Sequence, residues 1–152
     1  MSILTAGVTV RLALRQFYSK KWWERKAEAY SAVVESLSRM SYALSRDYSE
    51  HFEGRKVSSD EAASMWDQFR AARQEIERRA QVGHFQLAEE AVDELRSLVA
   101  ELETQRPDGN WLDDLDRHLS ATQSALARIT RVAKIDLRVR GRRRFRPFAA
   151  KR

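Results

Sequence analysis

Few side chains in this chain of 152 residues could do chemistry. It has no cysteine, which excludes disulfides, thiolate metal sites and cysteine nucleophiles. Its three histidines, His51, His84 and His118, lie in three different segments, no two of them stand at helix-face spacing, and no Glu-x-x-His motif occurs on an inward face. The five glycines are isolated, without the Gly-rich run before a lysine that cradles phosphates. We therefore expect no metal and no cofactor.

One pair of residues has the spacing of a known enzyme motif. Ribonucleases of the HEPN type are helical bundles with an arginine followed four to six residues later by a histidine, and Arg46 to His51 resembles that motif. The polar Asp47 after the arginine suits it as well. Arg79 and His84 share the spacing, and in so arginine-rich a chain about one such match is expected by chance. We therefore predict that the protein is not an enzyme and keep a HEPN-like ribonuclease as an alternative.

The net charge of +6 is distributed unevenly along the chain. Residues 1–26 hold six basic residues and one acid, and residues 134–152 hold nine basic residues and one acid. The stretch between them, 27–133, holds thirteen basic and twenty acidic residues. An acidic body is thus flanked by two basic ends, a layout that favours an anionic partner.

Hydrophobic spacing predicts four helices, over about 8–52, 58–82, 86–103 and 111–137. Ser58 with Glu61 forms a capping box at the start of the second helix. Gly83 is expected to end that helix in a left-handed conformation. The residues expected to face the core are Trp23, Ala27, Tyr30, Val34, Leu37, Leu44, Tyr48, Ala62, Met65, Trp66, Phe69, Ala72, Ile76, Ala80, Leu87, Ala91, Val92, Leu95, Leu98, Val99, Leu102, Leu112, Leu115, Leu119, Thr122, Leu126, Ile129 and Ala133.

These elements predict an all-α fold, an antiparallel four-helix bundle with an over-long N-terminal helix and a basic C-terminal tail. Short connections place neighbouring helices antiparallel, so both basic clusters should meet at one end. The first helix is too long for its partners and should project beyond that end. We therefore divide the chain into a projecting part (1–22), the bundle (23–137) and a basic tail (138–152).

Two segments combine basic and aromatic residues, KKWWERK at 20–26 and RRRFRPF at 142–148. Adjacent tryptophans on a helix lie 100° apart, so Trp23 is expected in the core and Trp22 on the surface. An exposed tryptophan among basic residues suits a membrane interface. The residues predicted to bind an anionic surface or partner are Arg11, Arg15, Lys20, Lys21, Trp22, Arg25, Lys26, Arg138, Arg140, Arg142, Arg143, Arg144, Phe145 and Arg146.

The segment FYSKKWWERKAEAY at 17–30 carries a further resemblance. It resembles a group of small, uncharacterised bacterial proteins in which one N-terminal transmembrane helix leads into a cytoplasmic helical bundle. AEEA at 88–91 and AKIDL at 133–137 extend the likeness. The resemblance implies an anchored bundle and no catalytic residues. The apolar run at 3–10 is too short to span a bilayer, so either the true start lies upstream or only a stub of the anchor is present.

Together these features predict a non-enzymatic, cytoplasmic helical module. Its basic end would dock on an anionic membrane surface, at the inner face of the membrane, or on a partner protein. Nucleic-acid binding by the same patch is the first alternative, since charge alone does not separate the two. The apolar residues within 3–22 predict self-association as well.

Overall fold

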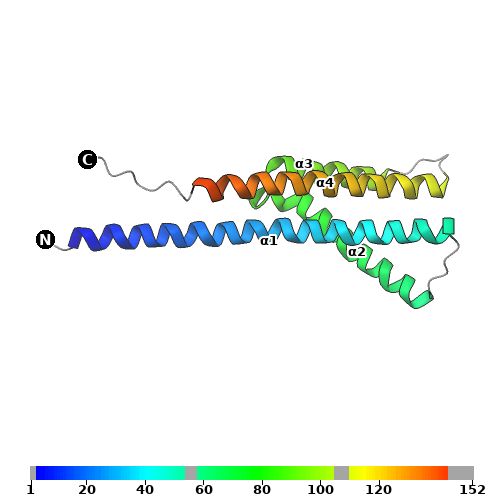
Figure 1. The fold of residues 1–152 in the computed structure, drawn as a ribbon, viewed down its shortest axis with the longest axis horizontal. Helices are drawn as coiled ribbons and strands as arrows, with labels where there is room; N and C mark the ends of the chain where they lie inside the picture. Colours follow the sequence, from blue (N-terminus) through cyan, green and yellow to red (C-terminus); the bar gives the residue numbers. More distant parts are fainter. Residues whose placement is uncertain (1–2, 54–57, 105–109, 144–152) are drawn as a thin grey trace.

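The computed structural model describes the backbone of residues 3–53, 58–104 and 110–143, and side chains within 18–52, 58–104 and 110–137. It contains α1 (Ile3–Glu53), α2 (Ser59–Val82), the short 3-10 helix η1 (Gly83–Phe85), α3 (Glu89–Glu103) and α4 (Trp111–Arg143) (Figure 1). These described ranges hold helices and no strand. The prediction of an all-α helical bundle is confirmed.

Helices α1 and α4 lie side by side and run in opposite directions (Figure 1). Near one end the Lys26 side chain contacts Asp136, and near the other the rings of His51 and Trp111 lie 4.3 Å apart between centroids. His51 is 25 residues after Lys26, and Trp111 is 25 residues before Asp136. The two helices therefore keep one register along the bundle.

Helix α3 lies behind α4 in Figure 1, and α2 crosses behind α1 at an oblique angle. The first half of α2 diverges from α1, so its apolar side chains find less to pack against. Met65, Trp66 and Phe69 were expected in the core and are only half-buried. The buried residues of α2 are Ala72, Ile76 and Ala80.

The core fills the space between the four helices with aliphatic side chains and one tyrosine. Each such side chain contributes about 1.5–3 kcal/mol when it leaves water, so these residues dominate the stability of the bundle. Most predicted core positions are buried, but on α1 the buried stripe includes Val33, Met40 and Ala43, which were not predicted. The largest fully buried side chains are Tyr30, Leu37, Met40, Ile76, Leu95, Ile129, Val33, Val92 and Thr122.

Two helix ends show how the sequence sets the boundaries. The Ser58 hydroxyl accepts a hydrogen bond from the Glu61 amide at 3.3 Å, which is one half of the predicted capping box. Gly83 does not adopt the predicted left-handed conformation, because its φ is −66°. It begins η1, and a Cβ there would lie 3.0 Å from Leu87 Cδ1, so close packing explains the glycine. The third helix accordingly starts at Glu89, three residues later than expected.

Helix α4 extends farther than predicted, and the start of α1 extends beyond the end of α4. We expected α4 to end near Leu137, but its backbone stays helical to Arg143, which lies inside the segment predicted as a tail. Arg143 is seven residues past Asp136, so in the register above it stands level with residue 19. The α1 backbone begins 16 residues before that point, at Ile3, which adds about 24 Å of helix. The first buried residue described on α1 is Ala29.

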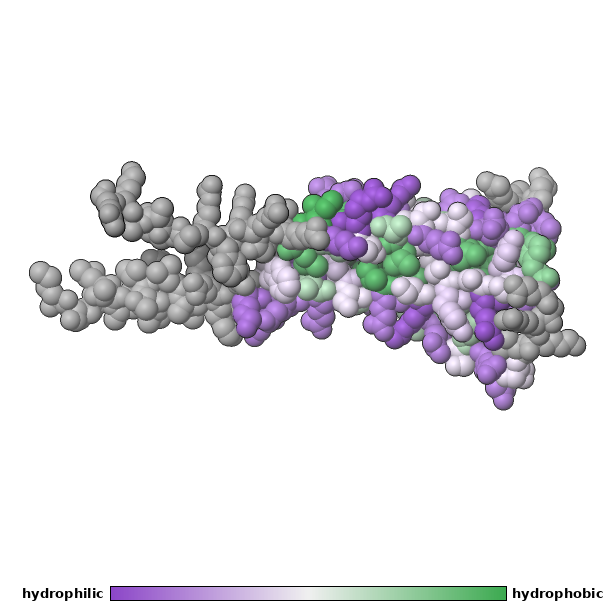
Figure 2. Space-filling model, in the orientation of Figure 1, coloured by the Kyte–Doolittle hydropathy of each residue, from purple (hydrophilic) through white to green (hydrophobic). Residues whose placement is uncertain are grey.

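The described surface mixes polar and apolar residues. Figure 2 shows hydrophobic groups along the middle of this face, bordered by hydrophilic residues on both sides. Many of the charged residues form exposed pairs within one helix, such as Arg39 with Glu35 and Arg96 with Asp93. Exposed pairs of this kind contribute little to stability, about 0.2–0.5 kcal/mol each.

Candidate functional site

Most of the predicted binding residues belong to the start of α1 and the end of α4, and the fold brings these two helix ends to the same end of the molecule (Figure 1). We call this the basic end, defined as residues 11–26 and 138–143. Its charge follows from the sequence. Residues 1–25 contain five basic residues and one acid, Glu24, and residues 137–152 contain eight basic residues and no acid.

A polar cluster lies where the basic end meets the core. Lys26 Nζ lies 2.7 Å from Asp136 Oδ1 and 2.6 Å from Oδ2. The Tyr30 hydroxyl donates to Asp136 Oδ2 at 2.7 Å and accepts a hydrogen bond from the Ala88 amide at 3.0 Å. Burial raises the pKa of the Tyr30 hydroxyl, the Ala88 amide opposes that rise, and Asp136 adds to it. The cluster joins α1, α4 and the N-terminus of α3.

This cluster corrects the role predicted for Lys26. Its side chain is only 12% exposed, and its charge is matched by Asp136 inside the bundle. Lys26 is therefore a structural residue, and the surface available to a ligand begins one turn earlier. Because the two partners are 110 residues apart, spacing along the chain gave no sign of the pair.

Aromatic and basic side chains lie together just beyond the cluster. Tyr18 is 68% exposed, Trp22 41% and Trp23 37%. The prediction that Trp22 is exposed is confirmed, whereas the prediction that Trp23 is buried is wrong, because both rings are exposed to a similar degree. The buried residues described on α1 begin only at Ala29, so these rings are less covered than the core side chains farther along the helix. The predicted binding residues that are exposed here are Lys20, Lys21, Trp22 and Arg25.

The other predicted binding residues are placed only in part. Arg11 and Arg15 lie on the helical backbone of α1, and the positions 138, 140, 142 and 143 lie on that of α4, while their side chains are outside the described set. Arg144, Phe145 and Arg146 lie outside the described residues. The fold therefore brings the backbone of α1 around residues 18–25 and the last part of α4, residues 137–143, to one end of the molecule.

The ribonuclease-like pair lies at the opposite end of the bundle. His51 Nδ1 lies 3.0 Å from the Asp47 carbonyl oxygen, and its ring packs edge-on against Trp111. The Arg46 Nε lies 3.9 Å from Glu50 Oε1. Burial raises the pKa of the Asp47 carboxyl, while His51 opposes that rise. Arg46 and His51 thus both have partners within their own helix or beside it, and this motif is separate from the basic end.

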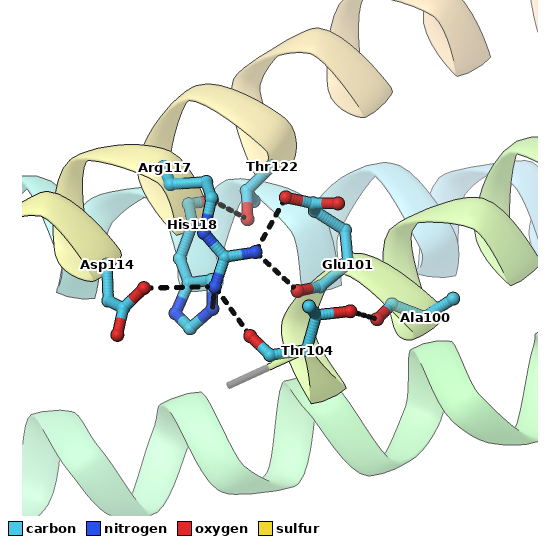
Figure 3. A network of polar contacts seen from close by, with 7 residues as sticks. All are labelled: Ala100, Glu101, Thr104, Asp114, Arg117, His118 and Thr122. Atoms are coloured by element: carbon cyan, nitrogen blue, oxygen red, sulfur yellow. Dashed lines mark hydrogen bonds and ion pairs between the residues drawn. The ribbon is translucent and has the colours of Figure 1, made fainter. Parts of the chain in front are cut away.

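A second polar network, which the sequence did not predict, surrounds Arg117 (Figure 3). Its guanidinium donates to the Glu101 carbonyl at 3.1 Å, to Glu101 Oε1 at 2.7 Å and to the Thr104 carbonyl at 2.6 Å. These carbonyls belong to the last turn of α3, where a helix lacks internal donors and attracts cations. Arg117 also contacts Asp114 and His118. The network closes the end of α3 and is structural.

The remaining candidate sites are weak. Within the described residues, no group of three or more His, Asp or Glu side chains could hold a metal ion. A groove of about 680 Å³ lies between α1 and the diverging half of α2, lined mainly by charged and polar residues that include Glu35, Arg39, Tyr42 and Asp60, together with Met65. Three acids and two arginines lie along it, a mixture that indicates no particular ligand. Among the described helices, none has a stretch long and apolar enough to cross a membrane.

The basic end is therefore the strongest candidate site, because the basic helical segments at the start of α1 and the end of α4 lie there together with three exposed aromatic rings. Comparison with protein-family models, curated proteins and solved structures gave no match for this chain.

Proposed function

We propose that this protein is a non-enzymatic helical module that docks through its basic end on an anionic membrane surface. The observation that carries the proposal is the exposure of Tyr18, Trp22 and Trp23 on the same part of α1 as Lys20, Lys21 and Arg25. Tryptophan and tyrosine rings are stable at the headgroup level of a bilayer, where an apolar ring and a polar edge both find suitable surroundings.

The charge at this end supports the same proposal. Each lysine or arginine near an anionic leaflet contributes about 1 kcal/mol of binding free energy. Lys20, Lys21 and Arg25 are exposed, and residues 137–143 at the end of α4 add four arginines at the same end of the molecule. The sequence of residues 144–152, which follows directly, holds four more basic residues. A dozen basic residues are enough to hold a protein of this size on a membrane without a spanning helix.

Vesicle flotation tests the proposal. The full chain should float with vesicles of phosphatidylglycerol and phosphatidylcholine and stay behind with vesicles of phosphatidylcholine alone. Equal recovery with both vesicle types, or recovery with neither, contradicts the proposal. The double variant Trp22→Ala with Trp23→Ala should float less well, whereas Tyr42→Ala, which removes an aromatic side chain 62% exposed in the middle of α1, should float like the wild type.

The same variants separate membrane binding from nucleic-acid binding. Contacts to a phosphate backbone depend mainly on charge and fall steeply with salt. If a nucleic acid is the ligand, a gel shift at physiological salt should show a complex that the tryptophan variant leaves nearly unchanged. If lipid is the ligand, no such complex should form and the tryptophan variant should lose vesicle binding.

A further inference from the structure

The composition of the groove between α1 and the first half of α2 indicates no small ligand, but its charges are sorted between two walls. The α1 wall carries Glu35, Arg39 and Arg46, a net charge of +1. The α2 wall carries Asp60 and Glu61, a net charge of −2. The two walls therefore have opposite net charges.

The opposite charges of the two walls stay apart within one copy of the chain. Among the described residues that line the groove, no ion pair joins one wall to the other. Arg39 and Arg46 instead lie near acids of their own helix, at 2.5 Å from Glu35 and 3.9 Å from Glu50. Pairs on an exposed helix surface contribute little to stability, so a better-placed acid can replace these partners at little cost.

The apolar stripe of α2 continues past the part of the helix that the bundle buries. Ala72, Ile76 and Ala80 in the second half are buried, whereas Met65 and Trp66 in the first half are only half-buried. Figure 1 shows this first half running outward from α1. Apolar surface that is left partly in water favours a further packing partner.

A helix with an apolar stripe is the kind of element that fits a groove between two diverging helices. Each copy of this chain carries such a groove, and in the first half of α2 it also carries such a helix. A two-fold contact uses the same surface of both copies, so that surface must complement itself. A surface with one acidic and one basic wall meets this requirement, because each wall can face the opposite wall of the other copy.

We infer that this groove is the contact site for a second copy of the chain. The first half of α2 of each copy lies against the α1 wall of the other, about a two-fold axis. Asp60 and Glu61 of one copy thereby meet Arg39 and Arg46 of the other, and Met65 of both copies lies within the contact. The groove is lined by none of the residues of the basic end, so the inference does not depend on the proposed function.

Distance measurements between spin labels in the full chain test this contact, and the cysteine-free sequence allows specific labelling. A single label at Ala63→Cys, an exposed position of α2 beside the groove, should give a short and narrow distance distribution between two copies. The matched control is a single label at Ser120→Cys, an exposed position of α4, which does not line the groove. If the Ala63 label gives no defined distance, or one no shorter than the control, the inference is overturned. Any association then belongs to another surface, such as residues 3–22.

Two charge variants make the test specific to the opposite walls. Asp60→Arg with Glu61→Arg, and Arg39→Glu with Arg46→Glu, each bring like charges together at the contact. Each variant alone should associate at least about tenfold more weakly than the wild type and lose the short distance at Ala63→Cys. An equimolar mixture of the two labelled variants places opposite charges together again, so the short distance should return.

The mixture also serves as the control for folding, because only two folded variants can restore the contact. Circular dichroism of each variant should show the helix content of the wild type. Association of either variant alone at wild-type strength contradicts the contact. A mixture of the two folded variants that does not regain the short distance contradicts it as well.

Discussion

Lys26 and Asp136 form an ion pair between α1 and α4, with Nζ 2.6 Å from Oδ2. Tyr30 completes this contact by donating to Asp136 and accepting from the Ala88 amide. The pair joins α1 to α4 where the basic end meets the core.

The first prediction concerns the tyrosine of this cluster. Tyr30→Phe should lower the free energy of unfolding by about 1–3 kcal/mol, because Asp136 loses a donor and the Ala88 amide loses its acceptor in a partly buried place. Urea unfolding of the variant measures the loss. Tyr42→Phe, at a position 62% exposed, is the control and should unfold like the wild type. If Tyr30→Phe and Tyr42→Phe have the same free energy of unfolding, the hydrogen bonds of the Tyr30 hydroxyl do not stabilise the fold.

The second prediction concerns the arginine that closes α3. Arg117→Ala should lower the melting temperature by roughly 3–6 °C, because the Thr104 carbonyl loses the guanidinium donor and the Glu101 carbonyl keeps only the Thr104 amide. The exposed Arg96, which pairs with Asp93 on its own helix, offers a matched control. Hydrogen exchange should show faster opening in the last turn of α3 only for the first variant. Unchanged exchange there would contradict the capping role.

The third prediction concerns the loss of stability at low pH to which His118 contributes. Burial and the neighbouring Arg117 lower the pKa of His118 below 6.5, Arg73 adds to this, and Asp114 and Glu101 oppose it. The unfolded chain binds the proton near pH 6.5, whereas the folded protein binds it only at lower pH. The contribution of His118 to stability is therefore complete above pH 6.5 and declines as the pH falls below it. Urea unfolding between about pH 8 and pH 5 should show this decline. The decline should be smaller in His118→Gln, and an equal decline in both proteins contradicts the assignment.

The fourth prediction concerns the Asp47 carboxylate, whose contribution to stability changes with pH in the opposite direction to that of His118. Burial raises the pKa of Asp47 above its ordinary value of 3.8, so the folded protein binds this proton more readily than the unfolded chain does. The charged form of Asp47 therefore destabilises the folded protein at neutral pH. The contribution of Asp47 to the free energy of unfolding should rise as the pH falls through the raised pKa and the carboxylate becomes protonated. Asp47→Asn should raise the melting temperature at neutral pH, whereas Asp67→Asn, whose side chain is 70% exposed, should not. A lower melting temperature for Asp47→Asn would show that the carboxylate is favourably paired.

The fifth prediction concerns self-association. α1 begins 16 residues beyond the level of Arg143, and the sequence of residues 3–18 contains many apolar residues. A helix of that composition is marginal in water without a packing partner. The full chain should therefore form larger species in light scattering than a chain that starts at Lys20, which keeps every core residue described here. If light scattering shows that the full chain and the chain starting at Lys20 are both monomeric, the prediction is wrong.

The fold could be predicted from the sequence because helix periodicity and turn residues are local signals. The four helices, the Ser58 cap and most of the core on α3 and α4 follow from spacing alone. The wrong predictions concern features that depend on packing between helices. Whether Trp23 is buried depends on where the core ends, and the end of α4 depends on its neighbour as well as on its own composition.

The candidate site could be predicted only in its composition. The basic and aromatic residues are visible in the sequence, but their grouping depends on contacts between distant residues. Lys26 was counted as a ligand-binding residue because its partner Asp136 is 110 positions away. Arg117 was missed for a similar reason, since its acceptors lie on the preceding helix across a turn.

A matched pair of charge variants tests the account most directly. Lys20→Gln, Lys21→Gln and Arg25→Gln remove three exposed charges from the basic end, and Arg70→Gln, Arg78→Gln and Arg96→Gln remove three exposed charges from the body of the bundle. The measurement is the partition coefficient of each triple variant on phosphatidylglycerol vesicles at physiological salt. At about 1 kcal/mol per charge, the basic-end variant should bind about 100-fold more weakly than the wild type, and the bundle variant should bind within a few-fold of it. Equal losses in the two variants would contradict docking through the basic end.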